Sequence, residues 1–194
     1  FDMKGENPRG RQYWEDYTAS PPHHGIGATI MNYRTGYINR FTVYGTYAYH
    51  LGIGEKTSLA AGFGAGLSGT NIDRSKIELA NPIDPAIGSG SSEINQTKPE
   101  LNVGLWLYGS NYFVGASALQ VIPVKVNLVD SAAYNSTLVP HLIATAGYRM
   151  FMTEDWTVLP SVMTRYISSM PLYVDINVKM QYRDRFWIGG SYRF

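Results

Sequence analysis

Four histidines are the side chains of this sequence with the clearest capacity to bind a metal, and they are His23, His24, His50 and His141. No two of them have the i, i+4 spacing of a helix or the i, i+2 spacing of a strand, either of which would place two ligands on one face. The acidic residues between positions 73 and 93 do not follow the spacing of an EF-type calcium loop. We therefore expect no metal site and interpret these residues as solvated or paired polar side chains.

Catalytic and nucleotide-binding motifs are also missing from the sequence. No Gly-x-Ser-x-Gly elbow is followed by a suitable acid and histidine, and a chain with no cysteine has no thiolate nucleophile, thiolate zinc site or disulfide. The run Gly62, Gly64, Gly66 is superficially similar to a phosphate-binding loop, but neither a Lys-Ser/Thr pair nor a helix start follows it. The sequence thus predicts no catalytic triad and no cofactor.

The composition departs from that of an ordinary soluble domain. A length of 194 residues fits one domain, but only 16% of the residues are charged, where a soluble domain has about a quarter. A net charge of +1 does not suit the concentrated basic surface that nucleic acid requires, so we expect no nucleic-acid partner. No run of about 18 apolar residues occurs, which excludes a transmembrane helix. The low charge therefore needs another cause.

A two-residue alternation of apolar and polar residues recurs along most of the chain and predicts β-strands. It is clearest over 171–183, where one face is apolar and the other is polar. The apolar face carries Leu172, Val174, Ile176, Val178, Met180 and Tyr182. This run is longer than the roughly five or six residues of a soluble strand and matches the roughly 9 to 11 that a tilted strand needs to cross a bilayer.

Nine such segments predict an all-β fold, specifically an antiparallel transmembrane β-barrel to which residues 24–194 contribute about nine strands. The segments are 26–30, 41–51, 59–67, 101–107, 112–118, 138–150, 156–166, 171–183 and 186–194. Bacterial single-chain barrels have an even number of strands, so we expect the complete barrel to be larger. Residues 1–23 show no clean alternation, and we interpret them as an irregular segment or the remnant of an earlier hairpin.

The connections between these segments alternate in length. Four are tight, at 52–56, 109–111, 153–155 and 184. The others are 33–37, the long loops 70–99 and 120–137, and 168–171. Outer-membrane barrels have short turns on the periplasmic rim and long loops on the outer rim, so the pattern predicts that location and orientation. A soluble sandwich has less reason to separate its connections in this way.

The polar face predicts a charged interior. The candidate lumen-facing residues are Arg149, Arg165, Asp175, Lys179 and Arg183. Asp175 and Lys179 would lie about 13 Å apart along one strand, so cross-strand partners are favoured over a direct pair. Two interpretations of these charges stay open: solvated or mutually paired side chains, which we favour, and a pore that attracts anions.

Three glycines on the polar face, Gly62, Gly64 and Gly66, predict a wall that other backbone can approach closely. Relief of steric crowding in a curved wall is the favoured explanation. Room for a plug, a neighbouring element or a passing segment is the alternative.

The two rims predict different contacts. Loops on a rigid scaffold are where proteins bind, so we expect the loops 70–99 and 120–137 to meet an exported partner. The candidate partner surface is Asp73, Arg74, Lys76 and Asp84. Aromatic residues near strand ends predict interfacial girdles, and they are Tyr37, Tyr108, Tyr112, Trp156, Trp187 and Tyr192.

An ordered series of short glycine-aromatic segments carries a family resemblance. In the first half these are Gly45-Thr46-Tyr47-Ala48-Tyr49, Leu59-Ala60-Ala61-Gly62-Phe63-Gly64-Ala65-Gly66-Leu67 and Leu79-Ala80-Asn81-Pro82-Ile83-Asp84-Pro85-Ala86. In the second half they are Tyr112-Phe113-Val114-Gly115-Ala116-Ser117, Thr145-Ala146-Gly147-Tyr148 and the segment 185–194. Together, over roughly 25–194, they resemble the PorP/SprF family of Bacteroidetes outer-membrane proteins.

The resemblance implies a non-enzymatic component of the type IX secretion and gliding machinery in the bacterial outer membrane. The implied partners are an exported surface protein with its terminal domain, periplasmic secretion-system proteins and outer-membrane lipid. Two alternatives belong to other classes. One is an outer-membrane channel for small solutes or hydrophobic molecules, motivated by the polar inner face. The other is a membrane-embedded hydrolase, for which the sequence offers no serine or carboxylate dyad.

Overall fold

The structure of the protein is a computed structural model. It describes residues 10–72, 94–122, 125–127, 135–137, 139–168, 170–183 and 185–194. Within these residues, no helix has both the length and the apolar character needed to cross a membrane.

One short helix and twelve strands make up the described residues. The helix is α1 (Arg11–Glu15). The strands are β1 (His23–Thr35), β2 (Ile38–Gly54), β3 (Thr57–Ile72), β4 (Ile94–Gly109), β5 (Tyr112–Leu119), β6 (Lys125–Asn127), β7 (Asn135–Thr137), β8 (His141–Tyr148), β9 (Met150–Phe151), β10 (Trp156–Ile167), β11 (Tyr173–Tyr182) and β12 (Phe186–Arg193). The prediction of an all-β fold is confirmed.

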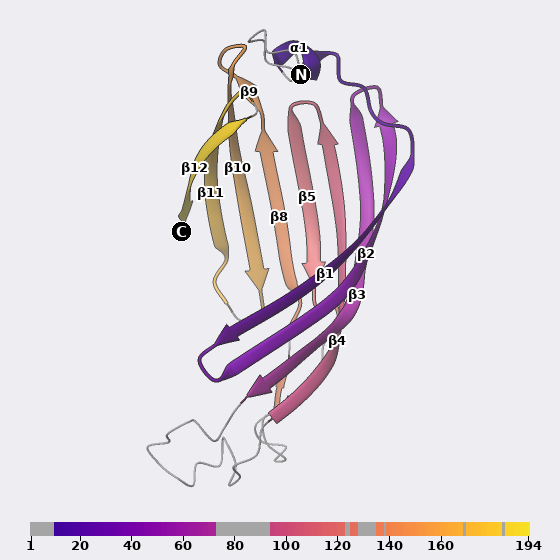
Figure 1. Cartoon of the computed structure of the whole chain (residues 1–194), viewed down its shortest axis with the longest axis vertical. Helices are drawn as coiled ribbons and strands as arrows, with labels where there is room; N and C mark the ends of the chain where they lie inside the picture. Colours follow the sequence, from indigo (N-terminus) through magenta and orange to yellow (C-terminus); the bar gives the residue numbers. More distant parts are fainter. Residues whose placement is uncertain are drawn as a thin grey trace.

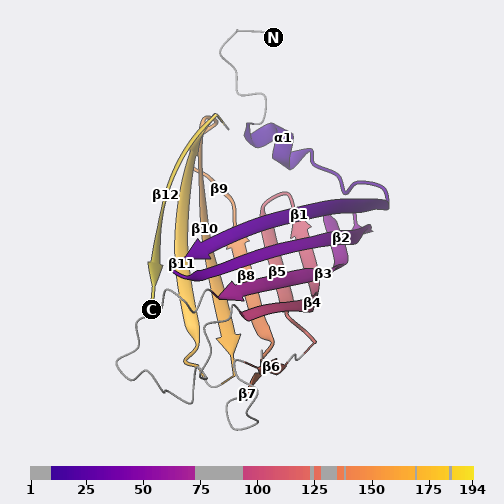
Figure 2. The same ribbon diagram turned by 60° about the horizontal axis from the view of Figure 1, so that its bottom comes forward.

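Ten of these strands form one antiparallel sheet in which neighbours follow the order of the sequence, and β6 pairs with β7 in a separate two-stranded sheet. The order in the large sheet is β1-β2-β3-β4-β5-β8-β10-β11-β12, and β9 pairs with β10 as a continuation of β8 beyond Arg149. This path of nine strands corresponds to the nine predicted segments, with β8 and β9 together forming the sixth. The sheet is strongly curled, and in Figures 1 and 2 the strands β1 and β2 run obliquely over strands in the middle of the sheet. Its two ends, β1 and β12, are not paired with each other in the described part of the chain.

Several strands extend further than the alternation predicted. β1 continues to Thr35 and meets β2 through a turn at Gly36 and Tyr37, where Gly36 has a left-handed φ of 56°. β3 and β4 reach into the segment predicted as the loop 70–99, and β6 pairs with β7 inside the segment predicted as the loop 120–137. Alternation did not reveal the extensions at 38–40, 68–72 and 94–100, because these stretches are mostly polar and each carries a single isoleucine at its end. Their register brings Asn39 opposite Asn71, and Asn71 opposite Asn95.

The two faces of the sheet have opposite polarity, and the apolar face is the exposed one. On β11, Ile176 is 46% exposed and Val178 is 43% exposed, whereas Asp175 on the other face is 6% exposed. The only hydrophobic residues buried among those described are Ala60 and Ile167, while Thr42, Ser58, Ser68 and Thr157 are also buried. We call the less exposed, polar side the inner face and the other the apolar face. Within the described residues, no hydrophobic core covers the apolar face.

The two rims differ in their connections. The rim drawn at the top of Figure 1 carries the turns at 55–56, 110–111 and 152–155, together with Arg183 and Arg185 between β11 and β12, and α1 lies beside it. The other rim carries the turn at Gly36 and Tyr37, the ends of β3 and β4 that flank residues 73–93, and the paired strands β6 and β7, which Figure 2 labels. We call these the short-turn rim and the loop rim.

Candidate functional site

The inner face of the sheet carries three of the five charged residues that sequence analysis predicted to face the lumen. The register pairs Arg165 with Tyr173, and Met163 with Asp175, so Arg165 and Asp175 lie on one face of the adjacent strands β10 and β11. Lys179 lies on the same face of β11, with its Nζ 5.0 Å from the centre of the Trp187 ring on β12. These three residues therefore belong to the wall of the interior.

Asp175 is held by an arginine from the next strand. The Arg193 side chain donates from Nε to Oδ1 of Asp175 at 2.6 Å and from Nη2 to Oδ2 at 3.1 Å. The predicted preference for a cross-strand partner is confirmed, and the partner is an arginine that sequence analysis did not single out. A bidentate arginine–carboxylate pair fixes the relative geometry of both groups, so this pair ties β12 to β11.

The other two predicted residues lie at the short-turn rim. Arg183 has a φ of 50° and donates to both carboxylate oxygens of Asp155, at 2.9 Å and 3.1 Å. The hydrogen bond to Asp155 raises the pKa of the Arg183 guanidinium above its ordinary value. Arg149 interrupts the ladder between β8 and β9, and its guanidinium lies 3.8 Å from the centre of the Trp14 ring. The five predicted residues thus form a wall group and a rim group.

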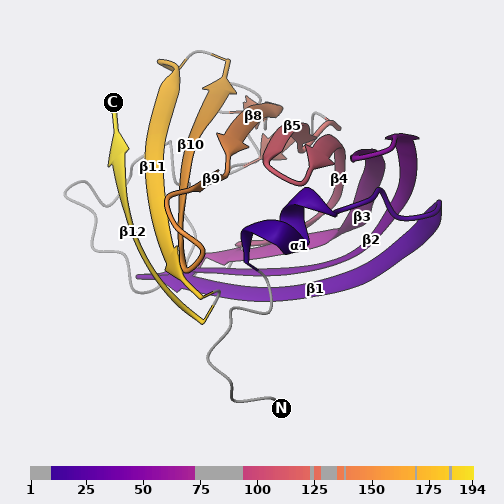
Figure 3. The same cartoon turned by 90° about the horizontal axis from the view of Figure 1, so that it is seen from above.

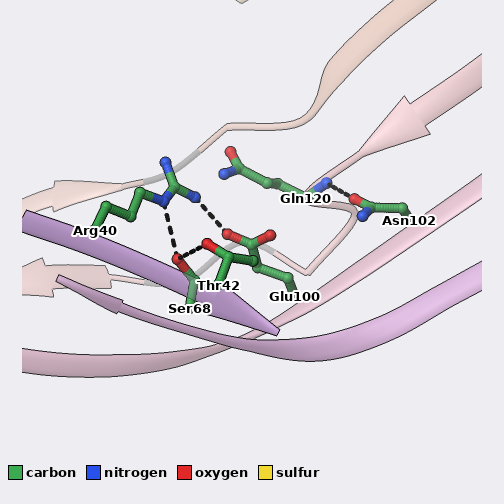
Figure 4. Close-up of polar contacts among 6 residues, drawn as sticks. All are labelled: Arg40, Thr42, Ser68, Glu100, Asn102 and Gln120. Atoms are coloured by element: carbon green, nitrogen blue, oxygen red, sulfur yellow. Dashed lines mark hydrogen bonds and ion pairs between the residues drawn. The ribbon is translucent and has the colours of Figure 1, made fainter. Parts of the chain in front are cut away.

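A second polar cluster spans β2, β3 and β4 near the loop rim (Figure 4). Arg40 forms an ion pair with Glu100 and donates from Nε to Ser68 Oγ at 2.9 Å, while Thr42 Oγ1 lies 3.1 Å from Ser68 Oγ. Sequence analysis missed this cluster. A signal was available, because the alternation of residues 101–107, if continued by one residue, places Glu100 on the polar face.

The three predicted wall glycines lie on the inner face against backbone of β2. A Cβ atom at Gly66 would lie 2.2 Å from Val43 O and 2.3 Å from Tyr44 Cβ. At Gly62 it would lie 2.9 Å from Tyr47 O, and at Gly64 3.2 Å from Thr46 Cγ2. The geometry therefore shows close approach of β2 to β3 at these glycines, as expected for relief of crowding within a curved wall.

Two of these glycines, Gly62 and Gly64, also line a cavity of about 580 Å³ that extends across β1 to β5 and reaches β8. Its inner-face lining combines small residues with three larger rings, those of Tyr44, His50 and Trp106. The Trp106 ring stacks on Phe113 with centroids 5.1 Å apart. The cavity is large enough for a bulky side chain or a small apolar molecule.

The pairing of β1 with β2 brings together two histidines, His23 and His50, that are distant in the sequence. The rings of His23 on β1 and His50 on β2 stack 4.6 Å apart at an angle of 6°. His23 Nδ1 lies 2.9 Å from Pro21 O, and His50 Nδ1 lies 3.0 Å from the Tyr108 hydroxyl. No group of three or more His, Cys, Asp or Glu residues suited to a metal ion occurs within the described residues.

Two of the predicted girdle residues do not lie on the apolar face. Tyr108 pairs in register with the buried Ser58, and Trp187 pairs with Gln181, so both belong to the inner face. The prediction rested only on the aromatic type of these residues and on their place near a strand end. The face on which a strand residue lies is decided by the register. The predicted partner surface of Asp73, Arg74, Lys76 and Asp84 lies outside the described residues.

An antiparallel sheet with an exposed apolar face and a paired, polar inner face defines the class of membrane proteins that cross the bilayer with strands. The chain matches the family model described as type IX secretion system membrane protein PorP/SprF over residues 11–194. The chain therefore belongs to the PorP/SprF family, and it is a membrane component of the type IX secretion system. No curated protein matches the chain.

Proposed function

We propose that the protein is a non-enzymatic component of the type IX secretion and gliding machinery in the bacterial outer membrane. On this proposal the loop rim faces the cell exterior and binds the terminal domain of an exported surface protein. The short-turn rim faces the periplasm and contacts secretion-system proteins there.

The observation that carries the proposed location is the inverted distribution of polarity across the sheet. Exposed Ile176 and Val178 would be costly in water, while the burial of Asp175, which is paired with the more exposed Arg193, suits an interior. In hydrocarbon the same apolar face needs no protein cover, and the backbone polar groups are satisfied by the strand ladder. Family membership supplies the secretion role.

Partner binding is favoured over conduction by the state of the inner charges. Glu100 and Asp175 are each engaged by an arginine, so these four groups structure the wall instead of standing open to a passing ion. The alternative is an outer-membrane channel for small solutes or hydrophobic molecules. The cavity of about 580 Å³ on the inner face is the observation that favours this alternative.

Deletion of the gene in its host, followed by proteomics of the cell surface, tests the secretion role. We expect specific exported proteins to be lost from the surface while the other outer-membrane proteins remain. Reintroduction of the intact gene is the control and should restore export. Unchanged export in the deletion strain would reject the role.

Conductance of the purified protein in planar bilayers separates the two candidates. Partner binding predicts no sustained openings. Large steady openings would favour the channel.

A further inference from the structure

The segment of residues 10–20, which we call the rim segment, lies across the short-turn rim. Figure 3 looks onto this rim and shows α1 surrounded by the curved sheet, and Figure 1 shows the same helix at the upper end of the strands. The rim segment thus lies where the interior meets the short-turn side.

A cation–π contact holds the helix to the sheet. The Trp14 ring lies with its centre 3.8 Å from the Arg149 guanidinium carbon, between β8 and β9. The indole Nε1 of Trp14 is buried, and Tyr17 stacks on the same ring with centroids 6.4 Å apart. Arginine over tryptophan is the strongest common pairing of this kind, particularly where water is excluded.

Backbone contacts hold the other side of the rim segment to the β2–β3 hairpin. Lys56 Nζ donates to the carbonyl oxygen of Glu15, and the backbone N–H of Ala19 donates to Glu55 O at 2.8 Å. A Cβ atom built on Gly52 would lie 3.4 Å from both Ala19 Cβ and Ser20 O. The rim segment is therefore anchored to strands on opposite sides of the curved sheet, at Arg149 and at the β2–β3 hairpin.

We infer that the rim segment is a closing element, docked in a site formed by Arg149 and the β2–β3 hairpin, which covers the inner face from the short-turn side. The inference rests on the proposed function at one point only, which is the assignment of the short-turn side to the periplasm. Ser58 supports the covering role. It pairs in register with Gly52, which contacts the segment, and it is only 2% exposed.

Thiol accessibility in the purified, lipid-embedded full chain tests the inference, and the absence of natural cysteines makes each engineered thiol unique. Ser58→Cys reports on the covered site. Ser68→Cys is the matched control, because Ser68 is also buried on the inner face of β3 but lies toward the loop rim. The reaction rate of each thiol with a maleimide is measured alone and combined with Trp14→Ala or Arg149→Ala.

Trp14→Ala and Arg149→Ala should each raise the labelling rate of the Ser58→Cys thiol by tenfold or more. Neither substitution should change the labelling rate of the Ser68→Cys thiol. Arg185→Ala, which removes an exposed arginine from the same rim, should change neither rate. An unchanged rate at position 58 in both variants would overturn the inference. An equal rise at positions 58 and 68 would also overturn it, since that result indicates general loosening of the sheet. None of these rates depends on export, so the outcome is independent of the secretion role.

Discussion

Individual carboxylates on the inner face are matched with arginines from other strands. Asp175 on β11 pairs with Arg193 on β12, whereas Glu100 on β4 reaches Arg40 on β2 across the intervening strand β3, where Ser68 also binds Arg40. Removal of one partner would leave a charge in a partly desolvated wall, which costs more than the pair contributes. The pairs therefore favour the observed strand register over a slipped one.

The glycines of β3 give the sharpest prediction for a single residue. Gly66→Ala should lower the free energy of unfolding by about 1–3 kcal/mol, the usual cost of overpacking, because the new Cβ would lie 2.2 Å from Val43 O. Gly45→Ala is the matched control on β2, since its Cβ would meet only Gly27 O at 4.0 Å. Denaturant unfolding in lipid vesicles measures both. Equal stability of the two variants would contradict the close-approach explanation.

The polarity of single residues was predictable from sequence, but their partners were not. Alternation assigns Asp175 and Lys179 to one face, and it also assigns Glu100 there once its strand is extended. Which arginine reaches which carboxylate depends on register, and so does the stacking of His23 on His50. Register depends on the position and length of each turn, and the alternation of apolar and polar residues alone does not fix these.

Strands are the scale at which sequence was most informative. The apolar positions from Phe41 to Leu51 on β2 and from Leu172 to Tyr182 on and beside β11 alternate without interruption, so both strands and their faces could be predicted. Their ends could not, because the hydrogen-bond ladder continues through mostly polar stretches, such as those around Asn39 and Asn71, where the regular apolar alternation has stopped. The helix α1 was missed for a similar reason. It is held by contacts of Trp14 and Glu15 with the rim and has no apolar periodicity of its own.

Substitution on the two faces of β11 tests what surrounds the sheet. Val178→Arg places a charge on the apolar face in the middle of the strand, and it should reduce the unfolding free energy in a bilayer by about 2–4 kcal/mol. Asn177→Arg, one residue earlier on the inner face, should have a much smaller effect. Denaturant titration in lipid vesicles provides the comparison. If the larger loss occurs at Asn177, lipid does not cover the apolar face.

The two rims of the molecule differ in the length of their connections and in the presence of α1. The orientation of the molecule across the membrane can therefore be tested by labelling each rim. Tyr37→Cys, in the exposed turn of the loop rim, should react with a membrane-impermeant maleimide on intact cells. Ser110→Cys, in a turn of the short-turn rim, should react only after the outer membrane is permeabilised. The opposite labelling pattern would reverse the proposed orientation and with it the partners assigned to each rim.

The extension of β2, β3 and β4 past their apolar stretches has a mechanical consequence. β2 is 17 residues long, so at a rise of about 3.3 Å per residue it exceeds what a tilted strand needs to cross the roughly 30 Å of hydrocarbon. The surplus lies at the loop rim, where Asn39, Asn71 and Asn95 continue the ladder from strand to strand. A cargo attached there would be carried on stiff, cross-linked backbone above the lipid. Tension along these strands would load many hydrogen bonds together in shear, which suits an anchor that has to resist drag at a moving cell surface.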